Sequence, residues 1–161
     1  MQIPENLLAL AVFMAINFAA ASSGAIFRPG TWYAGLSKPP WTPPNLAFPV
    51  VWTILFVLNA LSGWLVWIAG GADAAGALAI YGVSLVINAS WSGVFFGLRR
   101  MLLGLWVVLA LWLSIAAVIL TFSNFSTPAA LMQLPYLVWV TIAAALNLSV
   151  WRRNPAERQP A

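Results

Sequence analysis

The sequence contains no cysteine and no histidine, and it has very few acidic residues. Without cysteine, neither a disulfide framework nor a thiolate metal site can form, and without histidine the chain lacks the usual acid-base group at neutral pH. The only carboxylates in side chains are those of Glu5, Asp73 and Glu157, which lie near the chain ends or in a short connection. No pair of them is placed for hydrolytic chemistry or for a proton relay inside a membrane, and no metal site is expected.

Charge is scarce throughout, whereas apolar residues are abundant. Only 6% of residues are charged and 63% are hydrophobic, and the mean hydropathy is +0.92. A soluble globule of this length cannot bury so much apolar surface. The sequence therefore predicts an integral membrane protein, with no nucleic acid among its partners.

Apolar stretches long enough to cross a bilayer as helices recur along the chain. We predict a single all-α membrane domain over residues 1–161, a bundle of five transmembrane helices followed by a polar tail at 151–161. Pro135 should kink the fifth helix, because residue 131 loses its amide partner. The first span superficially resembles a signal peptide, but Glu5 stands where positive charge is expected. The predicted helices cover about 7–27, 49–69, 75–98, 102–122 and 129–150.

The basic residues support this count of helices. With five crossings, the N-terminus and the turns at 70–74 and 123–128 share one side of the membrane and contain no Lys or Arg. The opposite side carries all seven, and under the positive-inside rule it is cytoplasmic if the protein lies in a plasma membrane. The C-terminus and the loop 28–48 belong to this side. The seven basic residues are Arg28, Lys38, Arg99, Arg100, Arg152, Arg153 and Arg158.

The loop between the first two helices, residues 28–48 (the first loop), is rich in proline. The stretch 38–52 holds five of the eleven prolines. Proline fixes φ, removes a backbone donor and disfavours helix in the residue before it. We therefore expect Lys38, Pro39, Thr42, Pro43 and Phe48 to be extended and the second helix to begin around Pro49. A stiff loop of this kind is suited to covering a site.

Three of the predicted helices carry a stripe of aromatic and polar residues at helical spacing. An amide in hydrocarbon is costly unless it is hydrogen-bonded, so these stripes should face the bundle interior. They serve either as polar contacts between helices or as the wall of a ligand pocket. Ten tryptophans exceed what interfacial belts need, which favours a pocket for planar apolar ligands. The stripes are Trp52, Phe56, Asn59 and Gly63; Tyr81, Ser84, Asn88, Trp91 and Phe95; and Tyr136, Trp139, Ala143 and Asn147.

Pairs of small residues four apart, including Gly93 and Gly97, allow helices to approach closely. Such contacts form either within the bundle or between subunits, and we expect a homodimer.

The chain contains four aromatic and proline-rich motifs in a fixed order: Trp32-Tyr33-x-x-Leu36-x-Lys38-Pro39-Pro40-Trp41-x-Pro43-Pro44-x-x-x-Phe48-Pro49-x-x-Trp52, then Asn88-x-x-Trp91-x-x-x-Phe95-Phe96-Gly97, then Pro135-Tyr136-x-x-Trp139, then Leu146-Asn147. Together these motifs resemble the TspO/MBR family of tryptophan-rich sensory proteins and translocator proteins. The resemblance implies five transmembrane helices, frequent homodimers, and a pocket beneath the first loop. In that family the pocket binds protoporphyrin IX, haem and other planar lipophilic ligands. No cofactor is required, and porphyrin is the expected ligand.

The resemblance also implies the residues of this pocket. Tyr33, Pro43 and Phe48 would contribute from the first loop, on the resemblance alone. Trp52, Phe56, Asn88, Trp91, Trp139 and Ala143 would form the walls, and these lie on the stripes found from spacing. We expect no catalytic residue, unless the protein degrades porphyrin with light and oxygen as some bacterial relatives do, in which case Trp52 and Trp139 are the candidates.

Three functions therefore remain open. The first is porphyrin binding for tetrapyrrole sensing or regulation, in which the porphyrin ring rather than a metal is recognised, because the usual axial ligands of haem iron are missing. The second is the light-dependent degradation of porphyrin, and the third is the transport of porphyrins or other lipophiles.

Overall fold

The computed structural model describes residues 5–158, and the all-α prediction is confirmed. Residues 1–4 and 159–161, at the two ends of the predicted domain, lie outside the described residues. The helices are α1 (Glu5–Ile26), α2 (Thr31–Gly35), α3 (Ala47–Gly70), η1 (Gly71–Ala74), α4 (Ala75–Ser92), η2 (Gly93–Gly97), α5 (Met101–Phe122), α6 (Thr127–Met132), α7 (Leu134–Arg153) and η3 (Pro155–Arg158).

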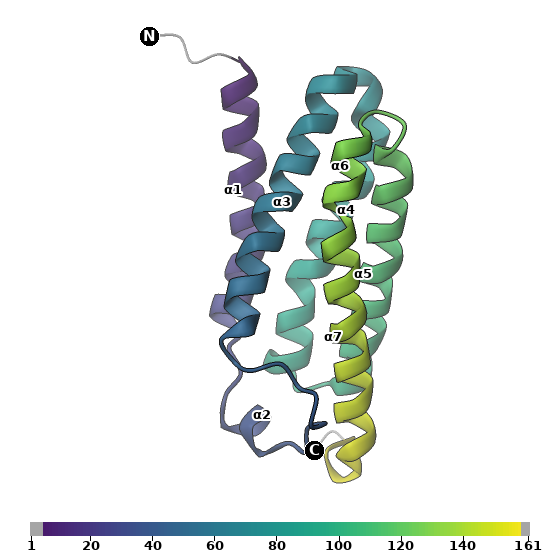
Figure 1. Cartoon of the computed structure of the whole chain (residues 1–161). Coiled ribbons are helices and arrows are strands. Elements are labelled where there is room, and N and C mark those ends of the chain that lie inside the picture. The colour runs from purple at the N-terminus through teal and green to yellow at the C-terminus, as the bar shows by residue number, and fades with distance from the viewer. Residues whose placement is uncertain (1–4, 159–161) are drawn as a thin grey trace.

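The long helices form an up-and-down bundle (Figure 1). In this view α1 runs downward, α3 upward, α4 downward, α5 upward, and α6 with α7 downward again. The first loop, which contains α2, lies at the lower end together with the end of α7. The sequence is apolar all round these helices, as expected of segments that meet both lipid and a packed interior.

Four helical stretches of the described chain are long and apolar enough to cross a membrane: Glu5–Ile26, Ala47–Gly97, Met101–Phe122 and Thr127–Arg153. The second has 51 residues, far more than the roughly 20 that one crossing requires. It contains α3 and α4, which run in opposite directions on either side of η1 (Figure 1). The protein is thus a multi-pass helical membrane protein, while a count of five crossings stays a prediction.

Two helices are interrupted near the pocket described below. The chain that was predicted as one helix over 75–98 changes to a π-helix at Gly93–Gly97, closed by a hydrogen bond from the Leu98 amide to the Gly93 carbonyl at 2.8 Å. In the last span, Gln133 separates α6 from α7. The interruption lies just before Pro135, whose missing amide was expected to kink the helix or relax it locally.

The first loop differs from the prediction in two respects. It contains a short helix, α2, which the prolines further along the loop did not indicate. Phe48 is not extended, because α3 already begins at Ala47. The first residues of a helix need no intrahelical amide partner, so Pro49 is tolerated one position after Phe48 in the first turn. Pro39 and Pro43 lie in irregular chain, and the extended conformation expected of them stays a prediction.

The polar stripes face inward as predicted, and part of them forms a buried hydrogen-bond network. Asn59 of α3 donates to the Asn17 side-chain oxygen at 2.8 Å and accepts from Gln133 at 2.7 Å. Gln133 also donates to Ser62 at 2.9 Å, and Asn17 donates to the Tyr81 hydroxyl. This network joins α1, α3, α4 and the break between α6 and α7. Here the stripe residues serve as contacts between helices rather than as a pocket wall.

The small residues Gly93 and Gly97 are used within the chain. A Cβ atom at Gly97 would lie 2.9 Å from the Phe27 ring, and one at Gly93 would lie 3.3 Å from it. The two glycines therefore accommodate the aromatic ring that follows α1. Dimer formation stays a prediction.

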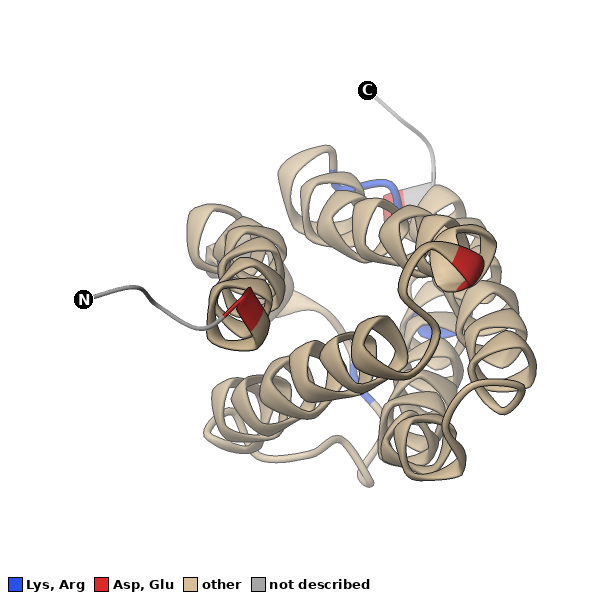
Figure 2. Cartoon of the chain, turned by 90° about the horizontal axis from the view of Figure 1, so that it is seen from above, with Lys and Arg blue, Asp and Glu red and all other residues tan. Residues whose placement is uncertain are grey.

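Charged residues are unevenly distributed between the two ends of the bundle. Figure 2 looks down on the upper end, where acidic residues mark the start of α1 and the turn after α3, and the basic residues lie at the far end. The sequence places Lys and Arg after α1, in the first loop, after η2 and at the end of α7. All of these segments lie at the lower end in Figure 1.

Candidate functional site

A pocket of about 660 Å³ lies between the helices, above the first loop. Its walls come from α1, α3, α4, α5 and α7, and the end of the first loop closes one side. This volume is within the range of about 300–1,000 Å³ that is typical of sites for small organic ligands. Most of its lining is apolar, with a few polar side chains among the aromatic ones.

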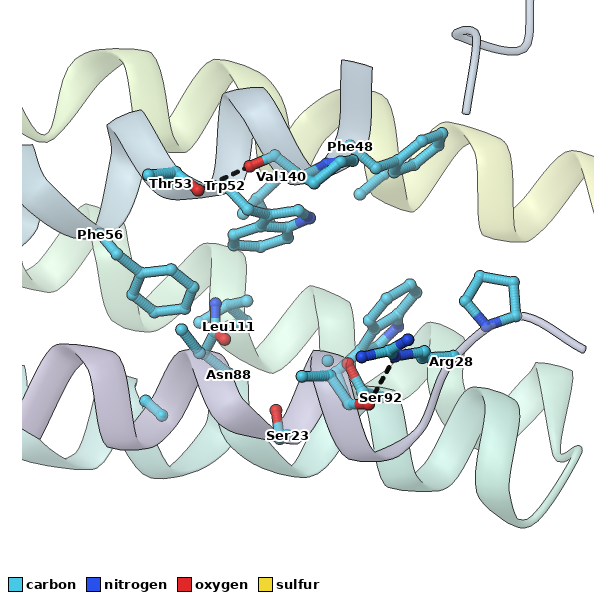
Figure 3. Close-up of a pocket in the computed structure, with 18 of the residues that line it drawn as sticks. Ser23, Arg28, Phe48, Trp52, Thr53, Phe56, Asn88, Ser92, Leu111 and Val140 are labelled. Carbon is cyan, nitrogen blue, oxygen red and sulfur yellow. Dashed lines mark hydrogen bonds between the residues drawn. The ribbon is translucent and has the colours of Figure 1, made fainter. Parts of the chain in front are cut away.

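Aromatic rings of α3 form one wall of the pocket. Trp52 and Phe56 lie one turn apart, with ring centroids 5.6 Å apart, and both point into the cavity (Figure 3). Tyr136 packs edge-on against Trp52 at 6.0 Å and supports its orientation from α7. A flat indole face fixed in this way suits stacking against a planar ligand.

The opposite wall comes from α4. Asn88 lines the pocket and donates a hydrogen bond to the Tyr136 hydroxyl, so its amide is held in place. Trp91 lines the same wall one turn further on and is stacked on Phe95, with centroids 5.3 Å apart and planes at 19°. The Trp91 indole nitrogen is buried and has no hydrogen-bond partner in residues 5–158. The wall therefore retains one donor that no described protein group uses.

Of the predicted site residues, Phe48, Trp52, Phe56, Asn88, Trp91 and Ala143 line the pocket. Tyr33, Pro43 and Trp139 do not. The Trp139 ring lies behind Phe48, at 5.7 Å between centroids. If the protein degrades porphyrin, Trp52 is thus the better placed of the two candidate tryptophans.

Tyr33 does not line the pocket, and its ring packs the first loop against the bundle. Its ring packs edge-on against Phe95 at 6.1 Å and Phe96 at 5.3 Å, and the Lys38 ammonium lies 4.6 Å from its centroid. Burial raises the pKa of the Tyr33 phenol above its ordinary value, so it stays neutral across the physiological range. Pro43 is half-buried in the irregular part of the loop. Both residues act on the pocket only through the position of the loop.

The first loop is also bound by the end of the chain, within the segment predicted as a polar tail. α7 continues to Arg153, and Asn154 makes two hydrogen bonds to the Ser37 backbone, at 2.8 and 3.0 Å. Trp32 donates to the Glu157 carboxylate at 3.0 Å. The part of the tail that the structure describes, up to residue 158, therefore holds the loop in place against the bundle.

Sequence reasoning missed two groups of pocket residues. The fourth predicted helix was not expected at the pocket, yet Val108 and Leu111 of α5 line it. These two residues carry no polar signal that distinguishes them from lipid-facing residues. The second group is polar and consists of Ser23, Arg28, Asn45, Thr53 and Ser92.

The described residues of this site offer aromatic faces and hydrogen-bonding groups. Over residues 5–158 there is no group of three or more His, Cys, Asp or Glu side chains that could hold a metal ion. The lining also contains no carboxylate, and its polar groups are hydroxyls, amides and one guanidinium. Such a pocket can enclose an apolar ring and hydrogen-bond to its edge.

Comparison with known proteins agrees with this architecture. The family model described as the TspO/MBR family matches residues 8–152. Protein CrtK of Rhodobacter capsulatus is 41% identical over 158 residues, covering 95% of this chain and 97% of its own. The tryptophan-rich sensory protein of Cereibacter sphaeroides is 40% identical, over 88% of this chain and 89% of its own. The human translocator protein is 36% identical, over 76% of this chain and 75% of its own.

Proposed function

Because this chain belongs to the TspO/MBR family, we propose that it is a membrane protein that binds porphyrins such as protoporphyrin IX and haem and acts in tetrapyrrole sensing or regulation. The observation that carries the proposal is the pocket of about 660 Å³ between the helices, which Trp52, Phe56 and Trp91 line with aromatic rings. A porphyrin is a broad, planar, largely apolar ring, and stacking on an indole face is the natural way to hold it. The sensory role is supported by the name of the bacterial relative, the tryptophan-rich sensory protein.

The protein should recognise the porphyrin ring and not its metal. The sequence has neither His nor Cys to bind haem iron axially in the usual way. We therefore expect metal-free protoporphyrin IX and haem to bind with dissociation constants within about three-fold of each other. Titration of the purified protein in nanodiscs, followed by quenching of tryptophan fluorescence, measures both. Loss of binding when the iron is absent would contradict ring recognition.

The proposal includes an orientation in the membrane. The end of the bundle with the first loop and the end of α7 carries the basic residues, and such ends stay on the cytoplasmic side. Porphyrin would then be bound near the cytoplasmic face. A green fluorescent protein fused to the C-terminus should fluoresce, and alkaline phosphatase fused at the same point should be inactive. Active phosphatase at the C-terminus would reverse this orientation.

A further inference from the structure

One cation lines the pocket. Arg28 lies just beyond the end of α1, and in Figure 3 its guanidinium extends along the edge of the cavity near Ser92. Its Nε donates to the Ala25 carbonyl at 2.9 Å, which anchors the base of the guanidinium. The terminal nitrogens make no hydrogen bond to the described residues 5–158, so they are available to a ligand.

The charge of Arg28 is not balanced by the protein. The pocket lining holds no Asp or Glu. Glu5 and Asp73 lie in the segments at the other end of the bundle, and Glu157 accepts a hydrogen bond from Trp32. A guanidinium without a carboxylate partner, beside an apolar cavity, favours an anionic group at that place.

The surrounding polar residues fit the same role. Ser23, Ser92 and Asn45 line the pocket together with Arg28 and supply hydroxyl and amide groups. Lys38 is a less suitable partner, because it donates to the Ala34 and Leu36 carbonyls, each at 3.2 Å, and lies over the Tyr33 ring. The aromatic walls and the polar edge thus divide the pocket into an apolar part and a part for an anion.

We propose that Arg28 is a specificity-determining residue that binds a carboxylate on the edge of the ligand, so that the pocket selects planar ligands with acidic side chains over neutral ones. The inference rests on the proposed porphyrin binding. It orients the ligand with its ring against Trp52 and its acid groups toward the open side, at the membrane surface. The arginine guanidinium can donate two parallel hydrogen bonds to one carboxylate, and the lysine ammonium cannot reproduce this bidentate geometry.

The test compares protoporphyrin IX with its dimethyl ester, which has the same ring but no acid group. Both are titrated into the wild-type protein, Arg28→Gln, Arg28→Lys and the control Arg100→Gln in phosphatidylcholine nanodiscs, which carry no net charge. Arg100 is exposed at the same end of the bundle and does not line the pocket. We expect Arg28→Gln to weaken protoporphyrin binding about ten-fold, Arg28→Lys to weaken it less, and Arg100→Gln to leave it unchanged.

The dimethyl ester separates this inference from the proposed function. It should bind the wild type about ten-fold more weakly than protoporphyrin does, and Arg28→Gln should change its affinity by less than about two-fold. Equal weakening of both ligands by Arg28→Gln, or no weakening of either, would overturn the role of Arg28 while leaving porphyrin binding intact. If neither ligand bound the wild type, the proposed function itself would fail.

Discussion

Replacing Ala143 with tryptophan is expected to weaken protoporphyrin binding by at least about thirty-fold, or roughly 2 kcal/mol, while the protein still folds. Ala143 lies on α7 and lines the pocket, so a large side chain there extends into the cavity instead of into a packed neighbour. The indole would occupy the space opposite Trp52 that the porphyrin ring needs. The loss should be similar for haem and metal-free protoporphyrin, because the steric conflict is with the ring.

The control for this variant is Ala145→Trp. Ala145 is exposed on the same helix and does not line the pocket. The Ala145→Trp variant adds the same side chain to a surface that faces lipid, so its affinity for protoporphyrin should be unchanged. Thermal unfolding of both variants in detergent establishes that each is folded. If Ala143→Trp bound protoporphyrin as tightly as Ala145→Trp, the porphyrin would have to bind outside this pocket.

Replacing Asn59 with leucine is expected to cause the largest loss of stability from a single polar residue. Asn59 is buried and is hydrogen-bonded to both Asn17 and Gln133. Without it, two polar groups are left unpaired between helices, and each buried unpaired group costs about 1–3 kcal/mol. Hydrogen bonds between membrane helices average only about 0.6 kcal/mol, since the unfolded chain in the membrane also finds partners. We therefore expect a loss of about 2 kcal/mol.

The matched control is Ser114→Ala, which removes a hydroxyl that bonds only to the Leu111 carbonyl of its own helix, at 2.7 Å. Thermal or denaturant unfolding in detergent measures the stability of each variant. Asn59→Leu should be clearly less stable than the wild type, and Ser114→Ala should be about as stable as the wild type. Adding Gln133→Leu to Asn59→Leu should cost less than the sum of the two single changes, because one unpaired group is then removed. Equal stability of Asn59→Leu and Ser114→Ala would mean that the network contributes little.

The periodic part of the site was predictable from the sequence. Trp52 and Phe56 are four residues apart, as are Ser84 and Asn88, and a polar residue in an apolar span has to face inward. That argument does not depend on the neighbouring helices. It therefore placed the stripes on the interior of the bundle, where the structure has them.

The same argument could not separate pocket from packing. Asn59 and Asn88 stand on equivalent stripes, yet Asn59 is hydrogen-bonded to Asn17 of α1 and to Gln133 between α6 and α7, whereas Asn88 borders the cavity. Whether a stripe residue borders the cavity or a neighbouring helix depends on how the helices cross. The sequence of one helix does not contain that information. Leu111 was missed for the related reason that an apolar residue looks the same on either face of a membrane helix.

From the sequence, Arg28 was predicted only as one of the basic residues at one end of the bundle. Its place at the pocket follows from the path of the first loop, since Phe27 packs against Gly93 and Gly97 and directs the chain toward α4. Tyr33 was assigned to the pocket through family resemblance alone, and Trp139 through both the resemblance and its place on a stripe. In the structure they support residues of the loop and pocket instead of lining it.

The central claim is that porphyrin binds in the cavity between α1, α3, α4, α5 and α7. Determining the structure of the protein with protoporphyrin IX in nanodiscs tests it most directly. The account predicts density for the ring beside Trp52 and Phe56, with its carboxylates toward Arg28. Porphyrin on the lipid-facing surface of the bundle, with this cavity unchanged, would contradict it.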